Sequence, residues 1–387
     1  MRQFWDCTKS RRATTWAKHA RKALSFIVSH GGATTRWRSV IIQVDCFASL
    51  RAVSEFLRTS PLPIIRFLEL LLDCPSEVDG SDETAFHSGS FAKPVPLFKD
   101  TPHNLRTARL HGFPNPFLFG HSNQLHLPGL VRLDLQFVDS PPNLRDISSL
   151  LKVTSQLEVL RFDFGWVEPE LTGASTPQPK IQLPCLREFA LKFIKEGFWS
   201  LHLLMTLNAP NVEYFQLGLG ECEVGDKELV QFIADGETSK PIFPEVTRLE
   251  VHLGTQPEAT PLLKILLQAH PKVTVLELPW TTLGPLSGKP WLVPRMERLR
   301  VAGCRGSELR KVVMARTKAK LPLKIVEAGL VFSNLIKSAD RKYLKKTVQF
   351  RFVDHGDLSD GEYNVVDDPP TDDEFGGLLS KYSQGSG

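Results

Sequence analysis

Residues 127–137 read LPGLVRLDLQF, and nearly the same phrase recurs along most of the chain. It consists of a proline, a variable residue, an apolar residue, two variable residues, and then two apolar residues separated by one variable residue. The phrase fits without a gap at seven prolines: Pro63, Pro128, Pro184, Pro210, Pro244, Pro271 and Pro294. Variants at Leu105 and Leu157 lack the proline at its usual place, and a degraded copy covers 323–328. The first apolar residues of successive copies are mostly 23–29 residues apart, so the chain carries an internal repeat.

The phrase predicts one short strand per repeat. Its last two apolar residues alternate with polar ones, so they point to the same face of a strand. One such strand cannot bury its apolar face alone, but stacked parallel copies can. A period in the twenties with an L-x-x-L-x-L core is typical of leucine-rich repeats. We therefore predict an α/β fold, an irregular leucine-rich-repeat-like solenoid of parallel strands and helices with about nine to ten repeats.

The segments between the phrases have helical periodicity. Residues 143–156 carry Leu144, Ile147, Leu150 and Leu151 on one stripe, and 258–270 has a similar apolar face. Residues 197–209, 226–235 and 306–316 follow the same pattern. We expect the proline to stop each helix and to start the next strand. The asparagine ladder of regular leucine-rich repeats is absent from the sequence, which predicts uneven turns.

The two ends of the chain differ from the middle, and the sequence predicts four regions. Residues 1–45 are expected to form a helix–strand cap, with a helix over 14–30 whose stripe includes Trp16, Ala20, Leu24 and Ile27. Residues 46–335 form the solenoid, which begins with a helix over 47–60. Residues 336–353 are a basic amphipathic segment. Residues 354–387 read as a disordered acidic tail, since 354–375 contains nine acids and no Lys or Arg.

Several classes of function find no support in the sequence. No run reaches the roughly 18–20 apolar residues of a membrane span, so we expect no membrane partner. The six cysteines form no CxxC pair, which indicates reduced thiols in an intracellular protein, cytoplasmic or nuclear. No metal-ligand spacing occurs, and Gly218 and Gly220 lack the third glycine of a dinucleotide loop. No nucleophile elbow is present. We therefore expect no cofactor, no metal and no enzymatic activity.

The order of these segments is similar to that of a known family. The stretch TTWAKHARKALSFIVSHGGATTRWRSVIIQV, then a helix, then SPLPIIRFLELLLD and proline-led repeats, resembles fungal F-box proteins with a leucine-rich-repeat-like C-terminal region. The RWRSV element at 36–40 is the strongest local match, and the resemblance covers roughly 12–330. It implies a repeat region that presents a substrate protein. In that family an F-box binds a Skp-type adaptor of a cullin ubiquitin ligase. No LPxEIL segment precedes residue 36, so such an adaptor is expected only if an F-box lies upstream of Met1.

The variable residues of the phrase are predicted to form the binding face. Their charges alternate in sign, whereas a groove that tracks phosphates would be mostly positive, which makes nucleic acid an unlikely partner. The sequence favours a non-enzymatic scaffold that binds a protein on the strand face, chiefly within 214–300. The alternatives are a ubiquitin-ligase substrate receptor whose F-box lies upstream and a nucleic-acid or chromatin accessory protein. The predicted contact residues are Arg132, Asp134, Arg161, Asp163, Tyr214, Arg248, Glu250, His252, Glu277, Arg298 and Arg300.

Overall fold

A computed structural model provides the structure of the chain. It describes residues 7–44, 46–72, 104–113, 127–139, 141–167, 179–195, 197–220, 225–236, 240–254, 256–353 and 365–366. The predicted acidic tail therefore lies outside the described residues, apart from 365–366. The chain divides into two compact units, an N-terminal unit of Met1–Glu245 and a C-terminal unit of Val246–Gly387.

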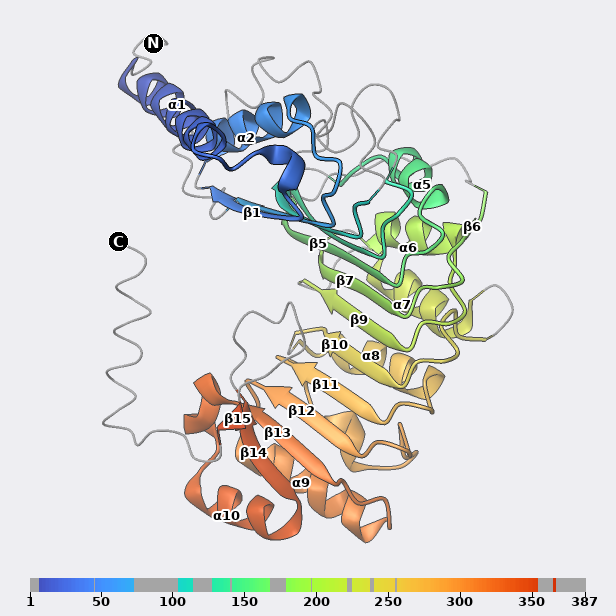
Figure 1. Cartoon of the computed structure of the whole chain (residues 1–387). Coiled ribbons are helices and arrows are strands. Elements are labelled where there is room, and N and C mark those ends of the chain that lie inside the picture. The colour runs from blue at the N-terminus through green and yellow to red at the C-terminus, as the bar shows by residue number, and fades with distance from the viewer. Residues whose placement is uncertain are drawn as a thin grey trace, which may run out of the picture. The chain divides into compact units, whose positions relative to one another are not determined.

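The N-terminal unit contains one sheet of seven described parallel strands in chain order. These strands are β1 (Ser39–Val44), β2 (Phe67–Leu72), β3 (Thr107–Phe113), β4 (Arg132–Asp139), β5 (Val159–Val167), β7 (Glu188–Ile194) and β9 (Tyr214–Leu219). The helical elements are α1 (Cys7–Ser29), η1 (Thr34–Arg36), α2 (Phe47–Thr59), α5 (Leu144–Lys152), α6 (Gly197–Thr206) and α7 (Asp226–Asp235). A second, small parallel pair joins β6 (Ile181–Gln182) to β8 (Leu207–Asn208). Helices α5, α6 and α7 lie on one side of the strands (Figure 1).

The C-terminal unit repeats this arrangement with five parallel strands. They are β10 (Arg248–His252), β11 (Val275–Pro279), β12 (Arg298–Ala302), β13 (Ile325–Gly329) and β14 (Gln349–Val353), and β15 (Val365–Val366) pairs antiparallel with β14. The helical elements are α8 (Ala259–Ala269), η2 (Gly284–Ser287), α9 (Gly306–Lys318), η3 (Leu330–Leu335) and α10 (Ser338–Thr347). The predicted α/β class, with parallel strands that alternate with helices, is confirmed.

The core explains why the apolar positions of the phrase recur. In the N-terminal unit, Leu133, Leu160, Phe189 and Phe215 are in register on successive strands and are fully buried. The rings of Phe189 and Phe215 stack with centroids 6.1 Å apart. The C-terminal unit has the same column in Leu249, Leu276, Leu299 and Val326. Each strand therefore buries its apolar face against the helices only when its neighbours are also in place.

The proline of the phrase leads into the strand, as the sequence predicts, and it does so within a turn. In five copies it is the second residue of a β-turn that leads into the strand: the amide of Leu130, for example, donates to the carbonyl of Leu127 at 3.2 Å. The fixed φ of proline suits that position of a turn. It is not a helix stop in every repeat, because β8 lies between α6 and Pro210.

Each strand starts with the same backbone bonds. The amides of Glu158 and Val159 both donate to the carbonyl of Val131, at 2.8 and 3.0 Å, and the amides of Arg187 and Glu188 donate in the same way to Glu158. Equivalent bonds recur in the C-terminal unit. The repeat therefore satisfies backbone groups at the start of its strands, and an asparagine ladder is not needed for that purpose.

Parallel strands also form before the first copy of the phrase and after the last one. Strand β1, within the predicted cap, pairs in parallel register with β2. The segment 336–353, predicted as basic and amphipathic, forms α10 and then β14, a further parallel strand beside β13. The sequence analysis missed β14 because no proline-led turn precedes it. No described helix is long and apolar enough to cross a membrane.

Candidate functional site

A column of charged side chains follows the strands of the C-terminal unit. The residue between the last two apolar positions of each phrase is in register with its equivalent on the next strand. In strand order these residues are Glu250, Glu277, Arg300, Glu327 and Arg351. We call this set the C-terminal ladder.

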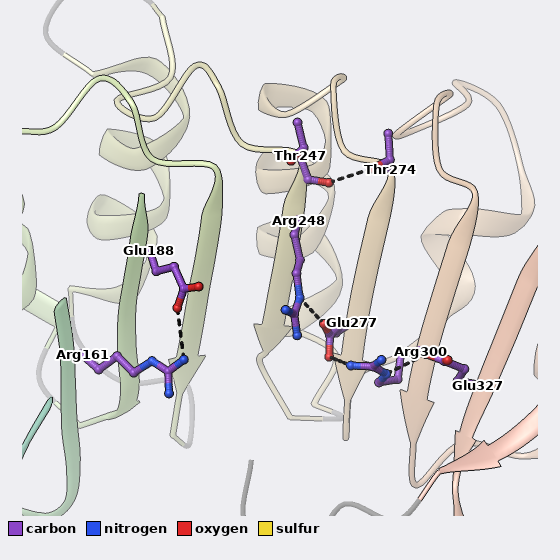
Figure 2. Close-up of polar contacts among 8 residues, drawn as sticks. All are labelled: Arg161, Glu188, Thr247, Arg248, Thr274, Glu277, Arg300 and Glu327. Atoms are coloured by element: carbon purple, nitrogen blue, oxygen red, sulfur yellow. Dashed lines mark hydrogen bonds and ion pairs between the residues drawn. The ribbon is translucent and has the colours of Figure 1, made fainter. Parts of the chain in front are cut away.

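The C-terminal ladder is held together by charge-assisted hydrogen bonds (Figure 2). Arg300 donates from Nη1 to Glu277 Oε2 and from Nε to Glu327 Oε2, both at 2.8 Å. Arg351 donates from Nε to the other oxygen of Glu327 at 2.8 Å. Arg248, two residues before Glu250, donates from Nε to Glu277 Oε1 at 2.7 Å. Each of the two carboxylates Glu277 and Glu327 is thus bound by two arginines.

Because these ion pairs are buried, they affect the stability of the fold. The Glu327 side chain is 1% exposed, and burial alone would raise the pKa of its carboxyl. The charges and hydrogen bonds of Arg300 and Arg351 outweigh that effect, and the pKa lies below its usual value. Loss of one partner would leave a buried charge uncompensated, which usually costs about 3–5 kcal/mol. The C-terminal ladder is therefore a structural feature, whatever else it does.

The N-terminal unit has a shorter column at the same position of the repeat. Glu69, Arg109, Asp134 and Arg161 are in register on β2 to β5, and we call them the N-terminal ladder. Arg109 Nη1 lies 3.4 Å from Glu69 Oε2, and Arg161 Nη1 lies 4.0 Å from Asp134 Oδ2. Arg161 also donates from Nη2 to Glu188, at 3.2 Å (Figure 2). The alternation of charges ends at the next strand, where Ala190 takes the equivalent position.

A polar cluster lies beside the N-terminal ladder. His111 Nε2 is 3.3 Å from Asp134 Oδ1. Burial would raise the pKa of Asp134, but the hydrogen bond and charge of His111, with Lys192 and Arg161, lower it below its usual value. Asp163 accepts a hydrogen bond from the amide of Gly165 at 2.8 Å. Its pKa is raised, because desolvation exceeds the opposing effects of Gly165, Lys192 and His111.

The predicted contact residues divide into two groups. Five of the eleven are buried, with exposed fractions of 3–7%: Asp134, Arg161, Glu250, Glu277 and Arg300. This corrects the expectation that the strand face leaves them open to a partner, because side chains from strands about 4.8 Å apart cover one another. The other six are half-buried: Arg132, Asp163, Tyr214, Arg248, His252 and Arg298. The predicted contact segment 214–300 also spans both units, with Tyr214 in the N-terminal one.

The sequence analysis missed two exposed aromatic residues at the ends of strands. Phe193 and Trp280 each follow the last core residue of their phrase by two positions, after Leu191 and Leu278. Both have a φ of 52°, in the left-handed region, and they are 45% and 43% exposed. Gly112 and Gly303 occupy the equivalent position of other repeats and also have positive φ. The backbone there thus favours glycine, and a bulky side chain costs on the order of 1–3 kcal/mol.

Packing fixes the Trp280 ring in place. A Cβ atom on Gly303 would lie 2.5 Å from the ring, so the ring rests directly against that glycine. The Phe332 ring meets the Trp280 ring nearly edge-on, at a centroid distance of 4.4 Å and an angle of 76°. The Trp280 amide also donates to the carbonyl of Ala302 at 3.0 Å. One part of the indole is thereby immobilised while the rest faces solvent.

The Phe193 ring packs against a glycine less tightly than the Trp280 ring does. The Phe193 ring lies about 3.5 Å from the place where a Cβ atom on Gly165 would be, and the Phe193 backbone amide lies close to Gly218. We call Phe193 and Trp280 the strand-end aromatics. An alignment of the residues that follow each phrase would have placed them in one column, but that column also holds the buried Phe137 and Phe164, so it would not have shown which aromatics are exposed.

Comparisons with known proteins do not identify the chain. No protein-family model matches it, and no curated protein sequence matches it significantly. Within the described ranges, no group of three or more His, Cys, Asp or Glu side chains could hold a metal ion. Phe193 in the N-terminal unit and Trp280 in the C-terminal unit are each a candidate contact site, because each is a half-exposed aromatic side chain.

Proposed function

We propose that this protein is a non-enzymatic protein-interaction scaffold with a leucine-rich-repeat-like solenoid. The proposal rests on one observation: two aromatic side chains, Phe193 and Trp280, stand half-exposed at the same repeat position, in a backbone conformation that disfavours them. Backbone strain of this kind is concentrated at functional sites. At Trp280 the strain is offset by packing, because the ring lies where a Cβ atom on Gly303 would be.

The chemistry of the strand ends favours a protein partner. Rigid aromatic rings supply much contact area with little loss of side-chain entropy, and Trp and Tyr are enriched among the residues that dominate protein interfaces. Near Phe193, Lys192 and the half-buried Asp163 add polar groups of both signs. The partner is expected to place apolar groups on the strand-end aromatics and polar groups around them. This role agrees with the substrate-presenting region that the resemblance to F-box proteins implies.

The half-buried charged residues that the sequence predicts as contacts are poor probes of this proposal. Arg248 holds Glu277, whose side chain is 4% exposed. Replacement of Arg248 by alanine therefore weakens the fold as well as any contact. Phe193 and Trp280 are better probes, because both are half-exposed and truncating them leaves no buried charge without a partner.

The test is a quantitative capture experiment from extracts of the source cells. Wild-type protein, Phe193→Ala, Trp280→Ala and the control Met205→Ala are immobilised at equal density, and the retained proteins are compared by mass spectrometry. Met205 is 42% exposed on α6, so it matches the aromatics in exposure but lies on a helix. We expect a set of proteins that wild type and Met205→Ala retain equally and that the aromatic variants lose at least about tenfold, since interface anchors contribute about 2 kcal/mol or more. Equal recovery on all four proteins contradicts the proposal.

A further inference from the structure

Helix α1 buries much less of its apolar surface than its sequence predicts. It lies against α2 (Figure 1). Leu24 is buried, with 7% exposed, and Arg21 donates to Glu55 of α2 at 2.8 Å. The predicted stripe of Trp16, Ala20, Leu24 and Ile27 was expected to face the core. Trp16 and Ile27 are instead 48% and 47% exposed, which corrects that expectation.

Three exposed apolar residues, Trp16, Phe26 and Ile27, lie within one sector of the helix. Trp16 and Ile27 are eleven residues apart, or about three helical turns, so they lie on the same line along the helix. Phe26 is 62% exposed and stacks on His30, with ring centroids 3.9 Å apart. We call Trp16, Phe26 and Ile27 the α1 apolar strip.

Basic side chains flank this strip. Lys18 and Lys22 are exposed, four residues apart, and therefore on one side of the helix. Residues 14–30 contain no Asp or Glu. Apolar and aromatic residues on one face, with lysines beside them, are the features of helices that lie in the interface of a membrane. Tryptophan in particular favours that interface, where its ring is partly wet.

We propose that α1 docks on an anionic lipid surface, with the α1 apolar strip in the headgroup region and Lys18 and Lys22 against the lipid phosphates. This goes beyond the proposed scaffold function and would place the scaffold at a membrane. It departs from the expectation of no membrane partner, which rested on the lack of a spanning segment. A helix that lies on a membrane needs no such segment.

Two other occupants of the strip are less favoured by its chemistry. A second copy of this chain, docked with α1 against α1, would bring the two sets of lysines together without an acid in 14–30 to balance them. A protein partner would need an acidic apolar surface to match a convex strip. An anionic bilayer offers both negative charge and apolar depth along the whole strip.

The test measures the sedimentation of the full chain with lipid vesicles. One vesicle preparation is phosphatidylcholine alone, and the other is phosphatidylcholine mixed with phosphatidylserine. We expect binding to the mixed vesicles only, and weaker binding at high salt. The double variant Lys18→Ala/Lys22→Ala should lower the affinity about 30-fold, because each lysine contributes roughly a factor of five near an anionic surface. Phe26→Ser/Ile27→Ser should abolish binding.

Matched controls come from α9, where Lys311, Met314 and Lys318 are exposed. Lys311→Ala/Lys318→Ala removes the same charge, and Met314→Ser removes an exposed apolar side chain. Both should bind as wild type, and all variants should keep the wild-type melting temperature. Sedimentation that is absent, that is equal with both vesicles, or that survives the α1 changes overturns the proposal. Binding of an acidic peptide without vesicle binding, or a dimer that only the α1 changes dissociate, overturns it in favour of a protein occupant.

Discussion

The two ladders occupy the same repeat position, but they end differently. In the C-terminal unit the charged column continues over five strands, from Glu250 to Arg351, and its central carboxylates each bind two arginines. In the N-terminal unit the column covers four strands, with longer ion-pair distances, and gives way to Ala190. The difference shows that charged side chains at one repeat position link five strands in one unit and only four strands in the other.

The comparison also changes how alternating charges should be interpreted. A pattern of opposite signs from strand to strand suggests a mixed binding surface when the sequence is considered alone. In the C-terminal ladder the same alternation is what allows parallel strands to bury charges, because each acid meets a base on the next strand. Like charges at one register position would repel. Glu250 and Glu277 are such a pair of like charges at one register position. Arg248, which is on the same strand as Glu250, donates a hydrogen bond to Glu277.

The largest effect is expected from a charge in the shared core. Leu133→Asp in the N-terminal unit and Leu276→Asp in the C-terminal unit each place a carboxylate at a fully buried site. We expect each to lower the free energy of unfolding by more than about 4 kcal/mol, because an unpaired buried charge is among the costliest changes. Urea denaturation followed by circular dichroism measures this. Val331→Asp, at a 49% exposed position, is the control. A core variant as stable as that control refutes the stacked-strand interpretation.

The next effect compares a buried carboxylate of the C-terminal ladder with a partly exposed carboxylate that bonds Arg161 of the N-terminal ladder. Glu327→Gln leaves Arg300 and Arg351 without their shared anion, and we expect a loss of about 3–5 kcal/mol. Glu188→Gln, in the N-terminal unit, removes an acid with a 36% exposed side chain, and we expect a loss of about 1 kcal/mol or less. Thermal unfolding of both variants gives the comparison. Equal destabilisation by the two changes means that the burial of a carboxylate does not determine how much its ion pairs stabilise the fold.

The smallest effect concerns the polar cluster. The pKa of the Asp163 side chain is raised in the folded protein, so its protonated form favours folding. This contribution is complete below the ordinary pKa of about 3.9, and it is lost as the pH rises through the folded pKa. Asp163→Asn keeps an oxygen for the amide of Gly165 and removes the buried charge. We expect the variant to be slightly more stable than wild type at pH 7.

The pH dependence supplies the check on that variant. The stability difference between Asp163→Asn and wild type should shrink as the pH falls through the folded pKa of Asp163, since the wild-type side chain then becomes neutral. Asp134 and Glu327 have lowered pKa values, so their contributions persist until more acidic pH in both proteins. A stability difference that stays constant from pH 7 down to the acid transition contradicts the raised pKa of Asp163.

Periodicity predicted most of the architecture for a physical reason. The α/β class, the strands at the phrases and the helices α2, α5, α7 and α8 follow from apolar spacing, which determines which face of an element is buried. Strand β14 was not predicted, because no proline turn precedes it, although Phe350 and Phe352 alternate with other residues as in the other strands. The turn bonds of the prolines and the carbonyl bonds at the strand starts involve backbone groups that every sequence has.

The candidate site was less predictable. Which charged residues are covered depends on the side chains of neighbouring strands, and that requires the register between strands. Glu277 lies between the last two apolar residues of its phrase and is buried, whereas Arg298 precedes that pair in the next phrase and is half-buried. The role of Phe193 and Trp280 depends on a left-handed φ and on glycines in other repeats, Gly165 and Gly303, which contact them in space. Nothing in the local sequence around either aromatic shows these contacts.

Hydroxyl-radical footprinting of the captured complex tests the central claim most directly. Trp, Phe and Met side chains all react, so Phe193, Trp280 and the helix-side residues Met205 and Met314 can be followed in one mass-spectrometric measurement. The account predicts that partner binding protects Phe193 or Trp280 while both methionines react as in the free protein. Protection of Met205 or Met314, with the strand-end aromatics as reactive as in the free protein, would place the interaction surface on the helices and contradict the account.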